Sequence, residues 1–207
     1  MAIVFVLVMA TALVEEAPHE YLGLALFTLM IAHIVLNRRW FSALRRGRWT
    51  AVRALQAASV LGLAICIVCQ AASAVVLSKH ALAILPAIPG SAVARSVHLM
   101  CSYWAFVLAF AHAGLQVKSA IRRIGGTRAT NRGLLWAFRI VVVALSAFGV
   151  VSFVQVGLPA YLTGQAQFAA GDPNVLFACA RWASGAVLDA AVVQCLRSVL
   201  ESHRRES

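Results

Sequence analysis

Six apolar runs, separated by short polar segments, dominate this chain of 207 residues. They lie at about 2–14, 21–36, 51–77, 96–117, 133–156 and 175–199. A helix needs roughly 20 apolar residues to cross a bilayer. Hydrophobic residues make up 62% of the chain and charged residues 12%, against about 45–50% and about 25% in soluble domains. The sequence predicts an all-α integral membrane protein, a bundle of about six transmembrane helices in a single domain, 1–207.

The first run leaves one alternative open. Residues 2–14 are few for a span, and Ala10-Thr11-Ala12 resembles a signal-peptide cleavage site. A signal peptide normally begins with basic residues, and none precedes Arg38. We therefore expect a short retained span, with five spans if this segment is cleaved or does not cross.

The positive charges mark the side of the membrane. The formal net charge is +11, and the basic residues cluster in 37–53, in 118–132 and in the C-terminal tail. The alternate segments are poor in Lys and Arg, which is typical of loops outside the cytoplasm. This pattern predicts cytoplasmic N- and C-termini. Because the clusters lie between apolar runs, they are interpreted as topology signals, and nucleic acid is not expected as a partner.

Four histidines carry the main functional signal. His19 and His33 are 14 residues apart, and so are His98 and His112. Fourteen residues of α-helix turn through about 1400°, close to four full turns, and rise about 21 Å. Each pair therefore lies on one helix face, with one histidine near each membrane surface.

The two helices that carry these pairs run in the same direction across the membrane. His19 then lies level with His98 near the outer surface, and His33 lies level with His112 near the inner surface. Two facing imidazoles suit the iron of a haem used for electron transfer, so the pattern predicts two haem b groups. Histidines that merely pack are the alternative. Zinc fits poorly, because neither level offers the Cys or carboxylate ligands of a tetrahedral site.

Several other residues of the apolar runs are candidates for a role at such a site. Gly23, one turn after His19, leaves room for a haem ring or packs against another helix. Arg95, one turn before His98, pairs with a haem propionate or is a topology charge. Asp189, inside the last run, accepts a proton, binds a quinone oxygen or makes an interhelical hydrogen bond. All five cysteines lie in apolar runs, and the C-x-x-C pair Cys66 and Cys69 is interpreted as packing.

Two segments resemble a known family. HEYLGLALFTLMIAHIVLNRRWF, residues 19–41, is similar to the signature of bacterial four-His diheme transmembrane cytochromes b, closest to the flavinylation-associated cytochromes. HLMCSYWAFVLAFAHAGLQ, residues 98–116, looks like their second ligand helix. The resemblance covers a core of about 5–155, to which a C-terminal helix at about 175–199 is added. It is looser to ferric-reductase-like membrane domains.

The resemblance implies a diheme bundle in a bacterial inner membrane, with His19, His33, His98 and His112 as axial ligands. It implies an electron-transfer subunit of a larger complex, with an extracytoplasmic, often flavin-carrying redox partner and with quinone as a further membrane-side partner. Two alternatives stay open. One is a self-contained membrane quinone or metal reductase, and the other is a haem-free scaffold or transporter.

Overall fold

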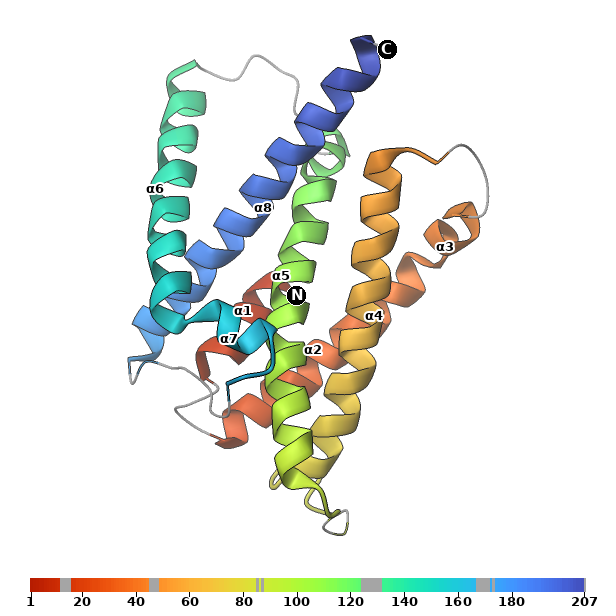
Figure 1. The fold of residues 1–207 in the computed structure, drawn as a ribbon, viewed down its shortest axis with the longest axis vertical. Helices are drawn as coiled ribbons and strands as arrows, with labels where there is room; N and C mark the ends of the chain where they lie inside the picture. Colours follow the sequence, from red (N-terminus) through yellow and green to blue (C-terminus); the bar gives the residue numbers. More distant parts are fainter. Residues whose placement is uncertain are drawn as a thin grey trace.

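The computed structural model describes residues 1–11, 16–44, 49–84, 86, 88–123, 132–166, 172 and 174–206. These residues form helices and turns and contain no strand. Figure 1 shows the helices in chain order. They are α1 (Ala2–Thr11), α2 (Glu16–Leu36), α3 (Arg38–Leu44), α4 (Ala51–Leu77), α5 (Ser91–Arg123), α6 (Arg132–Val156), α7 (Leu158–Leu162) and α8 (Val175–Glu206).

Five of these helices are long and apolar enough to cross a membrane, namely α2, α4, α5, α6 and α8. Their apolar stretches contain between 21 and 30 residues, so even the shortest rises about 32 Å. The prediction of an all-helical membrane bundle is confirmed.

Helix α1 does not span. It contains 10 residues and is therefore about 15 Å long. It begins near mid-height of the bundle and ends toward the outer end of α2 (Figure 1). By length and composition, the described helices therefore match the five-span alternative, with α1 as a shorter apolar helix. The cytoplasmic location of the N-terminus stays a prediction.

The bundle is built around α5. It packs against α4 on one side and α8 on another, and α6 pairs with α8. Small residues allow these close approaches. A Cβ atom added at Gly114 of α5 would lie 2.5 Å from the carbonyl oxygen of Ala190 in α8, and one added at Gly149 of α6 would lie 2.6 Å from that of Ser184.

Polar contacts fix α8 to α5 at the basic end. The Lys118 ammonium lies 2.6 Å from one carboxylate oxygen of Glu201, and Arg197 Nε lies 2.7 Å from the other. Arg197 is buried and also donates to the backbone carbonyl of Leu115. Burying an arginine is tolerated only when its donors are satisfied, so this network closes the basic end of the bundle.

An aromatic cluster fills the outer half of the bundle and holds α1 in place. The Phe5 ring of α1 lies 5.7 Å from the Phe106 ring of α5, and the Trp182 ring of α8 lies 5.0 Å from Phe106. Edge-to-face contacts at this distance stabilise beyond the area they bury. Helix α1 therefore packs between α5, α8 and α2.

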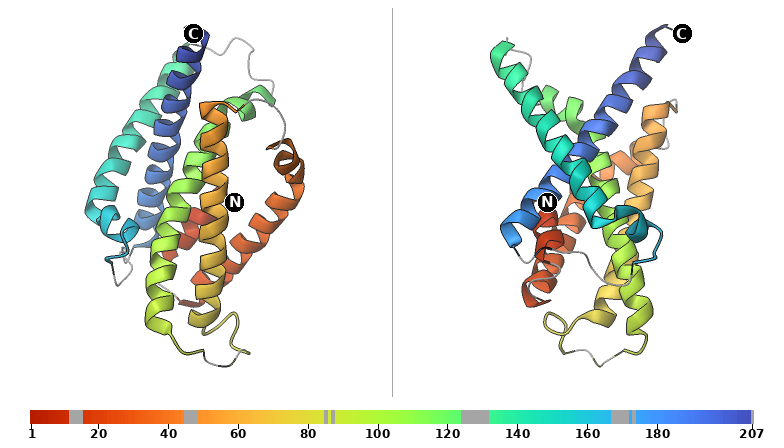
Figure 2. Two further views of the ribbon diagram at one scale, coloured as in Figure 1. Left: turned by 45° about the vertical axis from the view of Figure 1, so that its right-hand side comes forward. Right: turned by 60° about the vertical axis from the view of Figure 1, so that its left-hand side comes forward.

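Helix α2 is the least embedded of the five spans. Within the described part of the chain, its main backbone contacts are with α1 and α3. From Thr28 to Leu36 every residue is exposed except Met30, which is half-buried. The left view of Figure 2 shows α2 diverging from α4 toward its C-terminal end. Its outer end is held against the bundle, and its inner half stands apart.

Candidate functional site

The structure brings the outer histidine pair together. The rings of His19 on α2 and His98 on α5 have centroids 6.2 Å apart, and their planes differ by 67°. Two imidazole nitrogens about 2 Å from one metal ion, on opposite sides of it, place the ring centroids roughly 6 Å apart. The predicted partners therefore have the spacing of two axial ligands.

Hydrogen bonds fix which nitrogen of each outer ring is free. His19 Nδ1 lies 3.0 Å from the carbonyl oxygen of Val8, which can only accept. His98 Nδ1 lies 3.1 Å from Ser73 Oγ, whose hydroxyl donates to the Gln70 carbonyl at 3.1 Å. Both Nδ1 atoms are therefore assigned as N–H donors, which leaves an unprotonated Nε2 on each ring. Metal-ligating histidines usually have this arrangement, because a bonded second nitrogen fixes the ring and raises the basicity of the ligand.

The inner pair is arranged differently. His33 lies on the exposed half of α2, and the described residues show no ring contact between it and His112. His112 is half-buried on α5, and its buried Nδ1 has no hydrogen-bond partner among the described residues. An unpaired buried nitrogen is costly and needs an explanation. His33 and His112 are close enough to interact electrostatically, and His112 retains an unsatisfied polar atom at the predicted site.

Gly23 and Arg95 lie where the sequence predicts, on either side of the outer pair along their helices. A Cβ atom added at Gly23 would meet no atom within 4 Å. No helix packs on this glycine, in contrast to Gly114 and Gly149, so open space rather than helix packing surrounds it. Arg95 is exposed, one turn before His98, and has no ion pair among the described side chains.

Two further predicted features lie away from the outer pair. Asp189 is half-buried on α8 beside the backbone N–H of Ala111, and its Oδ2 atom is buried without a partner among the described residues. Cys66, Cys69 and Cys101 lie together between α4 and α5, and all three are free thiols. Within the described ranges, no group of three or more His, Cys, Asp or Glu residues is arranged to hold a metal ion. A haem iron needs only two protein ligands, so that arrangement is not required of the histidine pairs.

Sequence reasoning missed three contributors to the outer site, namely Val8, Ser73 and Glu20. Ser73 could have been found as one of the few polar residues of the 51–77 run, at a height near that of His98. The Val8 contribution is a backbone carbonyl and leaves no trace in residue type. Glu20 lies at the start of the second apolar run, and a lone acidic residue there carries no signal for a site.

The fold and the placement of its apolar helices define a multi-pass helical membrane protein. Comparisons with known proteins add no relative to this class, because no family model, curated protein or solved structure matches the chain.

Proposed function

We propose that this protein is a membrane-embedded electron-transfer protein that holds two b-type haems, one between His19 and His98 and one between His33 and His112. The outer pair carries the proposal, because its rings have axial-ligand spacing and both Nδ1 atoms are occupied by hydrogen bonds. When bound, a haem supplies a one-electron centre, while the protein fixes its ligands and tunes its potential.

The chain's own residues then have definite tasks at the outer site. Val8 and Ser73 hold the imidazoles of His19 and His98 in the tautomer that presents Nε2. Gly23 leaves space beside the His19 ring. Arg95 lies at the outer end of α5, where its guanidinium can pair with a carboxylate of the cofactor. The apolar bundle keeps water from the pair, which strengthens each of these electrostatic contacts.

The proposal also includes the membrane orientation of the protein and its redox partners. The basic ends of α5 and α8 favour a cytoplasmic side for this end of the bundle, in a bacterial inner membrane. Electrons would pass between a quinol or cytoplasmic-side donor and an extracytoplasmic redox protein, which can carry flavin. A small subunit of this kind is expected to work within a complex.

The first prediction concerns stoichiometry. The purified protein should contain two haem b groups per chain, all removed by acid acetone, because the sequence has no C-x-x-C-H motif for covalent attachment. The pyridine haemochrome assay and a reduced-minus-oxidised spectrum measure this directly. A ratio of one haem per chain would show that only one of the two proposed sites binds haem, and we would then withdraw the inner site. A ratio of zero would sink the proposal and leave the haem-free scaffold.

One observation favours a quinone-reducing or quinol-oxidising role as a second candidate function. A cavity of about 120 Å³ lies between α6 and α8, lined by Ser152, Phe153, Arg181 and Trp182 among others. Arg181 Nε and Ser152 Oγ are buried and have no hydrogen-bond partner among the described residues. Two donors without acceptors line one cavity, which favours a ligand that accepts hydrogen bonds.

The charge and the shape of this cavity restrict the chemical class of ligand that it can bind. Asp172 lies 3.7 Å from the Arg181 guanidinium and offsets its charge, so a neutral acceptor fits better than a phosphate. Trp182 and Phe153 supply aromatic walls. An apolar cavity of about 150 Å³ admits a benzene ring, so this cavity of about 120 Å³ would take only one carbonyl-bearing edge of a quinone ring.

The second prediction tests this cavity. Arg181→Gln should weaken binding of a short-tailed quinone at least tenfold, which corresponds to about 1.4 kcal/mol of binding free energy. Quenching of tryptophan fluorescence in detergent measures the affinity. Ser152→Ala should weaken it in the same direction without leaving Asp172 unpaired. Arg139→Gln serves as the matched control, because Arg139 lies in the other half of α6 beside Trp136. Equal affinities in all the variants would remove the quinone site.

A further inference from the structure

Helix α2 needs a restraint that the bundle interior does not supply. Within the described part of the chain it has few close backbone contacts with α4 or α5, yet its His19 ring lies 6.2 Å from that of His98. From Thr28 to Leu36 its residues are exposed except Met30, which is half-buried. Some contact at the outer end must therefore hold α2 at the distance that the outer pair requires.

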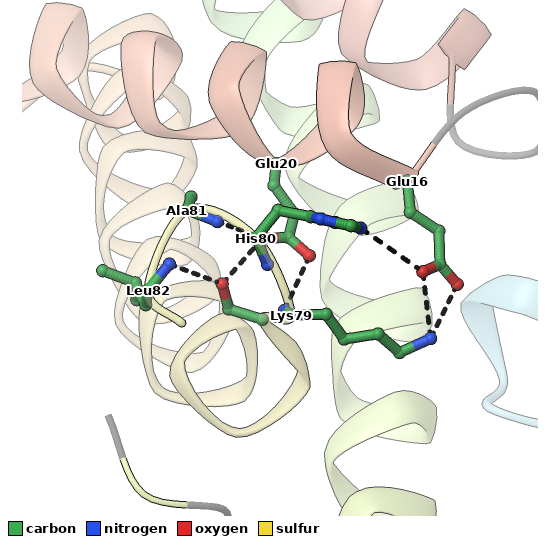
Figure 3. A network of polar contacts seen from close by, with 7 residues as sticks. Glu16, Glu20, Lys79, His80, Ala81 and Leu82 are labelled. Carbon is green, nitrogen blue, oxygen red and sulfur yellow. Dashed lines mark hydrogen bonds and ion pairs between the residues drawn. The ribbon is translucent and has the colours of Figure 1, made fainter. Parts of the chain in front are cut away.

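Glu20 makes that contact. Its carboxylate accepts four hydrogen bonds from the turn that follows α4 (Figure 3). Oε1 accepts from the backbone N–H of Lys79 at 2.9 Å. Oε2 accepts from the Ser78 hydroxyl at 2.7 Å and from the N–H groups of His80 and Ala81 at 3.0 and 2.8 Å.

This geometry is strong for a physical reason. Three successive backbone N–H groups that converge on one point form an anion-binding nest, and hydrogen bonds to an ionised acceptor are about twice as strong as neutral ones. Ser78 also ends α4, since its N–H donates to the Ala74 carbonyl at 2.8 Å. The carboxylate therefore joins α2 to the end of a spanning helix rather than to a loose loop.

The position of Glu20 connects this contact to the histidine. It follows His19 directly, so the two side chains leave α2 about 100° apart. One faces the turn after α4, and the other faces α5. Movement of the Glu20 end of α2 would move His19 by a similar amount.

Glu16 provides a natural comparison one turn earlier on the same helix. Its carboxylate lies 2.8 Å from the Lys79 ammonium and 3.8 Å from His80 Nε2, and both carboxylate and ammonium side chains are about two-thirds exposed, at 64% and 66% (Figure 3). Exposed ion pairs of this kind stabilise little. The two glutamates face the same turn, but only Glu20 bonds to its backbone.

We propose that Glu20 is a positioning residue for the outer histidine pair: its carboxylate clamps the outer end of α2 to the turn after α4 and so sets the distance from His19 to His98. The link to haem rests on the proposed function, whereas the clamp itself does not.

Two measurements test the clamp without haem. Hydrogen exchange in detergent should show the amides of Lys79, His80 and Ala81 protected in the native chain and at least tenfold faster in Glu20→Ala. In the His19→Cys/His98→Cys chain, which lacks both imidazoles of the outer pair and is prepared without haem, a short bis-maleimide should link positions 19 and 98. Mass spectrometry identifies that cross-link among the native cysteines. Adding Glu20→Ala should lower its yield several-fold, and adding Glu16→Ala should leave it unchanged.

Each outcome decides the proposal. Unchanged amide exchange in Glu20→Ala would show that no clamp exists. Fast exchange with an unchanged 19–98 cross-link would show that Glu20 orders the turn but does not position His19. If the native chain binds haem, Glu20→Ala should lower the occupancy of the outer site and spare the inner one, with Glu20→Gln intermediate. If it binds none, the proposed function fails, and the cross-link still decides the positioning role.

Discussion

Replacing His19 and His98 together by alanine is expected to leave one haem per chain, whereas replacing His19 and His112 together is expected to leave none. The first change empties a single site, because the centroids of the His19 and His98 rings lie 6.2 Å apart. The second change removes one ligand from each site. The difference follows from the parallel direction of α2 and α5. This direction places His19 opposite His98 and His33 opposite His112.

The measurement is the haem-to-chain ratio of each purified double variant, together with its spectrum. His80→Ala is the control, because His80 takes part in the outer contacts through its backbone N–H and through an exposed side chain 3.8 Å from Glu16. It should keep both haems. If the His19/His112 double variant keeps a bis-His haem while the His19/His98 variant keeps none, the histidines pair in the antiparallel sense and our assignment of sites is wrong.

Much of the fold could be predicted because the bilayer restricts the choices. A span must be apolar for roughly 20 residues and must satisfy its own backbone, so hydropathy predicted α2, α4, α5, α6 and α8. The 14-residue period, together with the common direction of the two helices, predicted that His19 and His98 could share a level. The neighbours of these histidines could not be predicted in that way, because Ser73 and the turn after α4 reach the site through the packing of distant segments.

The short helix α1 shows the limit most clearly. Its composition is as apolar as that of a span, and only its length in the structure shows that it stops inside the bundle. Val8 lies in its last turn, where the final four carbonyls of a helix have no intrahelical partner. The Val8 carbonyl accepts the hydrogen bond of His19 Nδ1 at 3.0 Å, in addition to one from the Thr11 hydroxyl at 3.3 Å. A helix that fails to cross the membrane therefore supplies an acceptor at a depth where a continuous span would have none to spare.

The difference between the two histidine pairs predicts the order of haem release. Both outer imidazoles have a bonded Nδ1, whereas His112 Nδ1 has no partner among the described residues and His33 is exposed. Loss of such a supporting hydrogen bond lowers metal affinity by about 10–100-fold. With excess apomyoglobin as acceptor, the inner haem should therefore leave at least tenfold faster than the outer one. Chains with a single intact pair, His33→Ala/His112→Ala and His19→Ala/His98→Ala, assign each rate.

The Ser73→Ala variant then tests whether the hydrogen bond of His98 Nδ1 causes the slower release of the outer haem. It removes the acceptor of His98 Nδ1 and should speed release of the outer haem by about tenfold, while the inner rate stays unchanged. Ser59→Ala is the matched control, because Ser59 is also buried on α4 and bonds the carbonyl three residues earlier, that of Gln56. If Ser73→Ala and Ser59→Ala release haem alike, the hydrogen bond does not hold the outer ligand. If the outer haem leaves first in the native chain, the inner half of α2 must close on its haem, and the exposure of His33 would belong to the haem-free chain alone.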